Sequence, residues 1–386
     1  MKKFISILSL AVLAAPSMAA TLNGFDVTAY GFLKASAMYS TQGLASYNNI
    51  NLSAPTNAMG RLPTRGQDKT SRMSFQTQQT RMGVNLKKGD NLTAKFEFDF
   101  IDFNKSSPTT QMNPRVRIAS VTYTNGNHKF IIGQDWDLFS PVTTYTFDYV
   151  GLYFLAGNTG FMRQQAQYLY TLNDWEFGGA LGMAGNNPGV QDSDLETGKS
   201  PTYSARATRK IGPKGRVGVS GIYSRLSYNQ PTENGSTRDA YAGNAFFENV
   251  WERFEIKSEA YYGQNLANLG ALSIGRGTQN YNAKEYGASL TGYYRMIDRH
   301  ALFGGVGVAR LDNRSQIGAL AVTNNVITSP GIRSNFLSRV GWDFKVTEDL
   351  SWMTEFSRYE TKSKIGADSY QNNVAYGLET GVQLRF

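Results

Sequence analysis

The sequence contains no cysteine among its 386 residues. A disulfide framework, a Cys-based metal site and a thiol nucleophile are therefore excluded. Beyond the N-terminal segment there is no run of about 18 apolar residues, so no helix is expected to span a membrane. Proline is scarce, with 11 residues, and no linker, charge block or low-complexity tract separates candidate domains. These absences favour one continuous domain.

The N-terminal segment is typical of a secretory signal. Two lysines precede an apolar stretch over 4–15, and small residues follow it. A membrane anchor would need about 20 apolar residues, and this stretch is too short. We therefore expect a signal peptide over 1–20, cleaved after Ala19 or Ala20, and a mature domain over 21–386.

What the chain has in abundance is aromatic residues and glycine: Tyr 22, Phe 22 and Gly 39. A secreted, cysteine-free chain of this composition is typically β-rich. The last strand shows the pattern most clearly, because large apolar and small or polar residues alternate over 373–386. One face carries Val374, Tyr376, Leu378, Thr380, Val382, Leu384 and Phe386, and the other carries Asn373, Ala375, Gly377, Glu379, Gly381, Gln383 and Arg385. An aromatic C-terminal residue on such a strand is what outer-membrane assembly is expected to recognise.

The same alternation recurs along the chain and predicts an all-β fold, a transmembrane antiparallel barrel. Tight turns with Gly, Asn and Asp alternate with long polar segments, as periplasmic turns and external loops do in outer-membrane barrels. The pattern over 240–253 is poor, so fourteen or eighteen strands remain open beside sixteen. The sixteen expected strands are 26–39, 72–86, 91–103, 115–124, 129–136, 162–172, 175–184, 203–211, 216–228, 240–247, 253–264, 285–295, 301–311, 335–344, 350–359 and 373–386.

The formal charge of +9 falls to +7 when Lys2 and Lys3 leave with the signal. In a cytosolic protein a basic excess would indicate nucleic acid, which is not expected here. In an exported barrel it favours a channel that prefers anions, because a confined lumen focuses the electric field.

Segment 137–161 is unusually aromatic for an external loop, since exposed loops rarely carry so much apolar surface. A barrel of about sixteen strands leaves an aqueous channel unless something folds into it. We therefore expect this segment to be an inward-folded constriction loop; the alternative is a contact surface with a neighbouring subunit. Its candidate site residues are Asp137, Phe139, Tyr145, Phe147, Asp148 and Tyr149.

Strand parity predicts which polar side chains face the lumen, because an arginine facing hydrocarbon is costly. The guanidinium group binds carboxylates bidentately, which suits anionic solutes. The alternative is that these cations pair with the wall carboxylates Glu97, Asp99, Asp135, Glu255 and Glu259. The predicted pore-lining residues are Arg81, Arg115, Arg117, Arg163, Arg206, Lys257, Arg339, Gln165 and Gln167.

Several segments in series resemble the DcaP-like family of trimeric outer-membrane porins. They are Tyr30–Lys34, Arg115–Arg117, Ile132–Phe139, Phe147–Gly151 and Phe161–Tyr168, and the similarity is densest over 26–172. The resemblance implies a homotrimer of sixteen-stranded barrels that takes up negatively charged small molecules, such as dicarboxylic or aromatic acids, by diffusion.

By the same analogy Arg115, Arg117 and Arg163 would line the pore. The chain departs from some family members, because the barrel is expected almost at once after cleavage, with no coiled-coil extension before it. The expected partners are small anionic solutes, the lipid bilayer and lipopolysaccharide.

No catalytic constellation stands out, and no cofactor or metal is expected. His128 and His300 lie at predicted turns, without the carboxylate or cysteine spacing of a zinc site. Residues 192–196 are acidic but lack the full calcium-loop pattern. Two other hypotheses about function stay open. One is a barrel enzyme of lipase or protease type, which needs a nucleophile with His or paired carboxylates. The other is a plugged structural or adhesive barrel.

Overall fold

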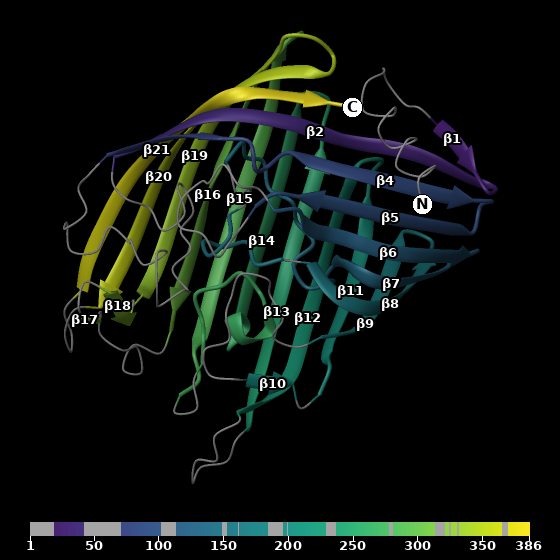
Figure 1. Cartoon of the computed structure of the whole chain (residues 1–386). Coiled ribbons are helices and arrows are strands. Elements are labelled where there is room, and N and C mark those ends of the chain that lie inside the picture. Colours follow the sequence, from purple (N-terminus) through teal and green to yellow (C-terminus); the bar gives the residue numbers. More distant parts are fainter. Residues whose placement is uncertain are drawn as a thin grey trace.

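The computed structural model describes residues 19–41, 71–101, 113–148, 153–160, 162–183, 196–198, 200–228, 237–277, 281–312, 321–323, 326–329, 332–364 and 370–386. Figure 1 shows that long strands make up most of these ranges and curve around a barrel. In this described part of the chain, sixteen wall strands form one closed antiparallel sheet. The prediction of a sixteen-stranded all-β barrel is confirmed.

Each wall strand pairs with the next along the chain, and the last strand pairs back to the first, with Phe32 opposite Arg385. The wall strands are β2 (Phe25–Ser40), β4 (Arg81–Lys88), β5 (Leu92–Asp99), β6 (Arg115–Asn125), β7 (His128–Trp136), β8 (Met162–Leu172), β9 (Trp175–Gly182), β11 (Thr202–Ile211), β12 (Gly215–Tyr228), β13 (Thr237–Val250), β14 (Phe254–Gln264), β15 (Lys284–Ile297), β16 (His300–Leu311), β19 (Ile332–Lys345), β20 (Leu350–Lys364) and β21 (Tyr370–Arg385).

Short elements accompany the wall. β3 (Arg72–Gln76) and β4 both pair with β2, while β1 (Ala19–Leu22) pairs with the start of β2 and β10 (Glu196–Gly198) pairs with the end of β12. The remaining elements are the hairpin of β17 (Ala321–Thr323) with β18 (Val326–Ser329) and the 3-10 turn η1 (Leu266–Leu269). No helix among the described residues is long and apolar enough to cross a membrane.

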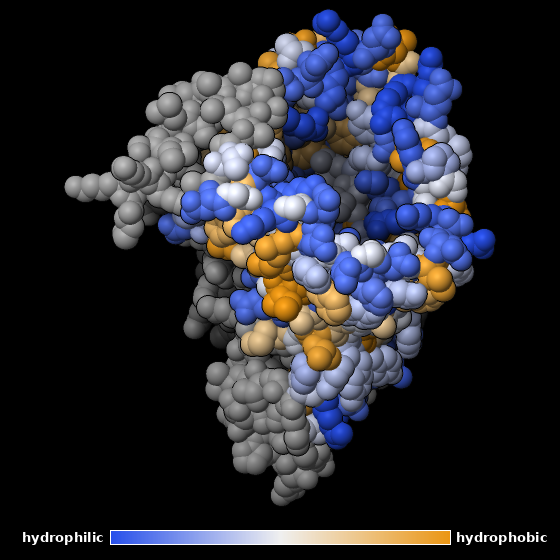
Figure 2. Space-filling model, turned by 90° about the vertical axis from the view of Figure 1, so that its right-hand side faces the viewer, coloured by the Kyte–Doolittle hydropathy of each residue, from blue (hydrophilic) through white to orange (hydrophobic). Residues whose placement is uncertain are grey.

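The in-and-out alternation of β21 follows the sequence pattern. Leu378 and Leu384 are each 41% exposed on the outer surface, whereas Glu379, between them, is only 2% exposed inside the barrel. Apolar side chains on the outside and polar ones inside are the arrangement that a lipid environment requires of a barrel. Figure 2 shows hydrophilic side chains gathered around a hollow on the side that faces right in Figure 1.

The tight turns lie where the sequence predicts them. Gly89, Gly126, Asn173 and Gly212 have φ between 52° and 62°, a left-handed conformation that glycine and asparagine adopt at low cost. These turns join β4 to β5, β6 to β7, β8 to β9 and β11 to β12, and so lie at one end of the barrel.

One predicted strand is interrupted. The sequence predicts a continuous strand over 72–86, but β3 ends at Gln76 and β4 begins at Arg81, with a turn between them. At this turn the Thr80 hydroxyl accepts the backbone N–H of Lys34 on β2 at 3.1 Å and donates to the Lys34 carbonyl at 3.3 Å, in place of ladder hydrogen bonds. The turn carries Gln79 into the lumen.

The predicted signal peptide falls almost wholly outside the described residues, which begin at Ala19. The loops predicted over 40–71 and 185–202 also fall mostly outside them, as does the acidic segment 192–196. The poorly patterned region near residue 240 is a regular strand, β13, that is longer than predicted at both ends.

Candidate functional site

The segment that follows β7 turns into the barrel at Asp137. The Asp137 carboxylate accepts backbone N–H groups from Phe139 and Ser140 at 3.1 and 3.4 Å, and Arg163 lies 3.5 Å away. Burial raises the pKa of Asp137, and the positive charge of Arg163 opposes that rise. Short-range backbone capping together with one buried cation therefore fixes the direction of the segment where it leaves the wall.

The aromatic side chains of this segment are buried inside the barrel. Phe139 packs with Ile222, Leu226 and Tyr261 of strands β12 and β14. Tyr153 packs on the opposite side, in a cluster with residues of β16, β19, β20 and β21. The apolar surface that would be anomalous in an external loop is thus covered by both sides of the wall. Tyr149, also predicted for this site, lies outside the described residues.

A cavity of about 520 Å³ lies between this segment and the wall. Six cationic and two anionic side chains line it, so its lining carries an excess of positive charge. Aromatic side chains from both the segment and the wall complete it. The cations are Arg81, Arg115, Arg117, Arg295, Lys345 and Arg385; the anions are Glu255 and Asp343; the aromatic residues are Phe32, Trp136, Tyr145, Phe147, Phe154, Tyr293 and Phe303.

Three predicted arginines share two carboxylates at one side of the cavity. Arg115 binds Asp99 bidentately, Nε to Oδ1 at 2.9 Å and Nη2 to Oδ2 at 2.6 Å. Arg117 reaches Glu97 at 2.8 Å and Asp99 at 3.3 Å, while Arg81 lies 3.6 Å from Glu97. Asp99 and Arg115 are directly opposite each other on β5 and β6, so strand register alone creates this pair.

These three arginines pair with carboxylates of the wall and also line the cavity. Counting Glu97 and Asp99 behind them, the cavity still has two more cationic than anionic groups. Arg81 is the most accessible of the three, with 27% of its side chain exposed, against 14% for Arg115 and 7% for Arg117.

Arg295, Lys345 and Arg385 line the same cavity but are not among the predicted pore-lining residues. Strand alternation places Arg385 on the inward face. Phe32 of β2 lies opposite both Arg385 and Arg81, so the two arginines occupy neighbouring positions on either side of Phe32. Lys345 follows directly after the predicted end of its strand. All three residues lie at or next to the ends of their predicted strands, 285–295, 335–344 and 373–386.

On the other side of the cavity, residues of the inward segment contact side chains of the wall. Tyr145 donates its hydroxyl to Glu255, which also pairs with Arg295. Burial, and then the Glu255 carboxylate, raise the pKa of Tyr145. Lys257, predicted to line the pore, donates to the carbonyl of Thr143 at 3.0 Å and lies 4.2 Å from the Tyr145 ring.

Arg163 and Arg339, predicted for the pore, lie outside the cavity lining. Arg163 is 6% exposed and donates to the carbonyls of Met183 and Leu269 at 2.5 and 2.6 Å. Arg339 pairs with Asp148 at 3.0 Å. Both guanidinium groups bind protein atoms around the segment.

The remaining predicted residues lie near the base of the segment. Gln165 donates to the carbonyls of Asp135 and Trp136, and Gln167 donates to that of Trp136. Gln167 and Arg206 line a second cavity of about 220 Å³ behind the segment, and Arg206 pairs with Glu176 at 2.9 Å.

The two histidines lie at the short-turn end of the barrel. His128 contacts Tyr168, Nδ1 to hydroxyl at 2.8 Å, and His300 accepts a hydrogen bond from the Trp342 indole at 3.2 Å. Within the residues that the structure describes, no group of three or more His, Asp or Glu side chains could hold a metal ion.

The fold is that of the outer-membrane porins. The solved structure of the outer membrane channel DcaP of Acinetobacter baumannii is similar, with a TM-score of 0.73 and 15% identity over 95% of this chain and 99% of that one. The expected resemblance to the DcaP-like porins is thus confirmed at the level of fold.

Two further solved structures share the fold. An anion-selective porin from Comamonas acidovorans matches with a TM-score of 0.58 and 10% identity, over 94% of this chain and all of that one. The trimer form of OmpT from Vibrio cholerae matches with a TM-score of 0.53 and 15% identity, over 94% of this chain and all of that one. No protein-family model matches the sequence, and a search of curated proteins finds no similar sequence.

Proposed function

We propose that the protein is an outer-membrane porin through which small hydrophilic solutes diffuse passively, with a preference for anions. The observation that carries the proposal is the cationic cavity between the inward segment and the wall of a closed barrel. In this account segment 137–161 is the constriction loop, and the cavity beside it is the narrow part of the pore. Confinement strengthens the field of the six lining cations on a passing ion.

The composition of the cavity favours carboxylic acids, including those with an aromatic ring. Guanidinium groups bind carboxylates, and the rings of Trp136, Tyr145 and Tyr293 offer apolar contact beside them. Dicarboxylic and aromatic acids are therefore the proposed solutes. The proposed solute-facing residues are Arg81, Arg115 and Arg117 together with Arg295, Lys345 and Arg385.

We also propose that the barrel resides in the outer membrane after removal of residues 1–20. Trp175, Trp342 and Trp352 are exposed on outward faces near the short turns, as in the aromatic girdle of a membrane barrel. Contacts with lipid and lipopolysaccharide follow from that location. A homotrimer is proposed because the DcaP-like resemblance implies it and a trimeric form exists among the structural neighbours.

Liposome swelling tests the solute preference. Proteoliposomes would be diluted into isotonic solutions of dicarboxylates, aromatic carboxylates, matched cations or neutral sugars, and the swelling rates compared. We expect the acids to enter faster than neutral sugars of the same size. Equal rates would contradict the anion preference, and the absence of swelling with every solute would contradict the channel.

A further inference from the structure

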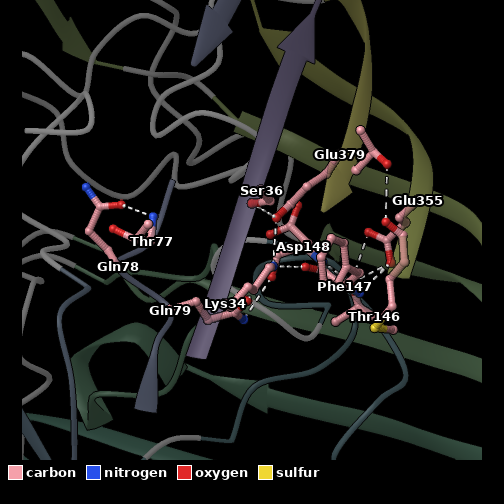
Figure 3. A network of polar contacts seen from close by, with 12 residues as sticks. Lys34, Ser36, Thr77, Gln78, Gln79, Thr146, Phe147, Asp148, Glu355 and Glu379 are labelled. Carbon is pink, nitrogen blue, oxygen red and sulfur yellow. Dashed lines mark hydrogen bonds and ion pairs between the residues drawn. The ribbon is translucent and has the colours of Figure 1, made fainter. Parts of the chain in front are cut away.

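The tip of the constriction loop, defined here as Thr146–Asp148, crosses to the far wall, and Figure 3 shows the polar contacts that hold it there. The Glu355 carboxylate of β20 accepts the backbone N–H of Phe147 at 2.8 Å and the hydroxyl of Thr146 at 2.8 Å. A wall carboxylate therefore fixes both backbone and side chain of the tip.

Arg339 of β19 holds the tip from the neighbouring strand. Its guanidinium group lies 3.0 Å from the Asp148 carboxylate, 3.5 Å from Glu355, and donates to the Thr146 hydroxyl at 2.8 Å. The Tyr359 hydroxyl adds a bond to Asp148 at 2.9 Å.

Lys34 of β2 holds the tip from the other side. Its ammonium group donates to the carbonyl of Phe147, lies 3.8 Å from the centre of that ring, and pairs with Glu379 at 2.7 Å. Gln79 links to both, since it accepts from Lys34 at 2.6 Å and donates to the carbonyl of Asp148 at 2.9 Å.

We propose that Lys34, Arg339 and Glu355 are positioning residues that fix the loop tip and thereby set the size limit of the pore. We call these three residues the tip clamp. They face inward by parity, but their side chains are at most 3% exposed, so they act on solutes only through the loop. The inference rests on the proposed channel function.

The tip clamp can set the pore width because the residues it holds also form the pore wall. Tyr145 and Phe147 line the cavity, and Thr146 and Asp148 between and after them bind the far wall. Displacing the tip therefore moves two aromatic rings that bound the opening. Removing the Arg339 charge leaves the buried Asp148 and Glu355 carboxylates without this cation, and replacing Glu355 by an amide removes one of the two carboxylates that bind Arg339; both changes favour displacement.

The size limit is measured with neutral sugars of increasing size, so the result does not depend on the anion preference. The variants are Glu355→Gln and Arg339→Met, and the matched control is Glu360→Gln on the same strand, where Glu360 pairs with Arg358 on the outer surface. We expect both clamp variants to admit sugars that the parent and the control exclude, and to show higher single-channel conductance. Heat-modifiable migration in gel electrophoresis shows whether the variant barrels are folded. An unchanged size limit in both folded variants would overturn the proposal.

A labelling experiment tests the tip clamp independently of conductance. The chain has no cysteine, so Thr144→Cys, placed in the buried and cavity-lining part of the loop, would carry the only thiol. We expect a thiol reagent to label it faster in the Glu355→Gln background than in the Glu360→Gln background. Equal labelling rates would refute the clamp even if the barrel conducts, whereas faster labelling in a non-conducting barrel would refute only the channel function.

Discussion

Arg81 offers the cleanest electrostatic test of the pore, because it lines the cavity and its nearest carboxylate, Glu97, lies 3.6 Å away. An ion about 7 Å from a guanidinium group in water interacts with it by about 0.6 kcal/mol. Salt at about 0.1 M leaves roughly half of that energy. Arg81→Gln should therefore disfavour an anion and favour a cation by about 0.3 kcal/mol each, which lowers the anion-to-cation permeability ratio about threefold.

The assay is the reversal potential of single channels in a planar bilayer under a salt gradient. At about 1 M salt the screening length falls to about 3 Å, so the same substitution should change the ratio only about 1.2-fold. Arg209→Gln is the control, since Arg209 faces outward over the Trp175 ring and loses the same charge outside the lumen. A change that does not depend on salt, or that the control reproduces, would refute the reasoning.

Three further substitutions follow from the structure. Arg115→Gln alone should lower anion preference and lower the free energy of unfolding in urea by about 1–3 kcal/mol, because Asp99 loses its bidentate partner and keeps only Arg117, while the double variant with Asp99→Asn should keep the parent reversal potential; equal results for the two would contradict the pairing. Gly157→Ala should lower the free energy of unfolding by more than about 1 kcal/mol, because φ is 101° and the new Cβ would collide with the Ala288 carbonyl; an unchanged unfolding midpoint would contradict this expectation. Phe386→Ser should reduce the yield of heat-modifiable barrel, and a full yield would show that the terminal aromatic is dispensable.

The barrel was predictable because each wall strand carries its own signal. Alternation over 373–386 gives both the strand and its inward face, and the glycine and asparagine turns mark where strands end. The break between β3 and β4 was not predictable from local alternation, since the Thr80 hydroxyl there binds the backbone of Lys34, 46 residues earlier in the chain. Local pattern determines which segments are strands, while distant side chains decide where a strand is interrupted.

The candidate site was predictable only in part. Parity correctly places Arg115 and Arg163 on inward faces, but an inward side chain reaches the cavity only if the loop does not cover it. Arg163 binds the carbonyls of Met183 and of Leu269 in η1, and Arg339 binds Asp148 of the inward segment, whereas Arg385 lines the cavity. That difference depends on the paths of residues 137–148 and of the turn around η1 inside the barrel, which alternation within the strands does not encode.

The central claim is that the cationic cavity makes the barrel an anion-preferring channel. It is tested most directly by reconstituting the unmodified protein in planar bilayers and measuring its reversal potential across a salt gradient at low ionic strength. We expect discrete conductance steps and a reversal potential of the sign given by faster anion permeation, which weakens as the salt concentration rises. A potential of the opposite sign, or a folded barrel that does not conduct, would contradict it.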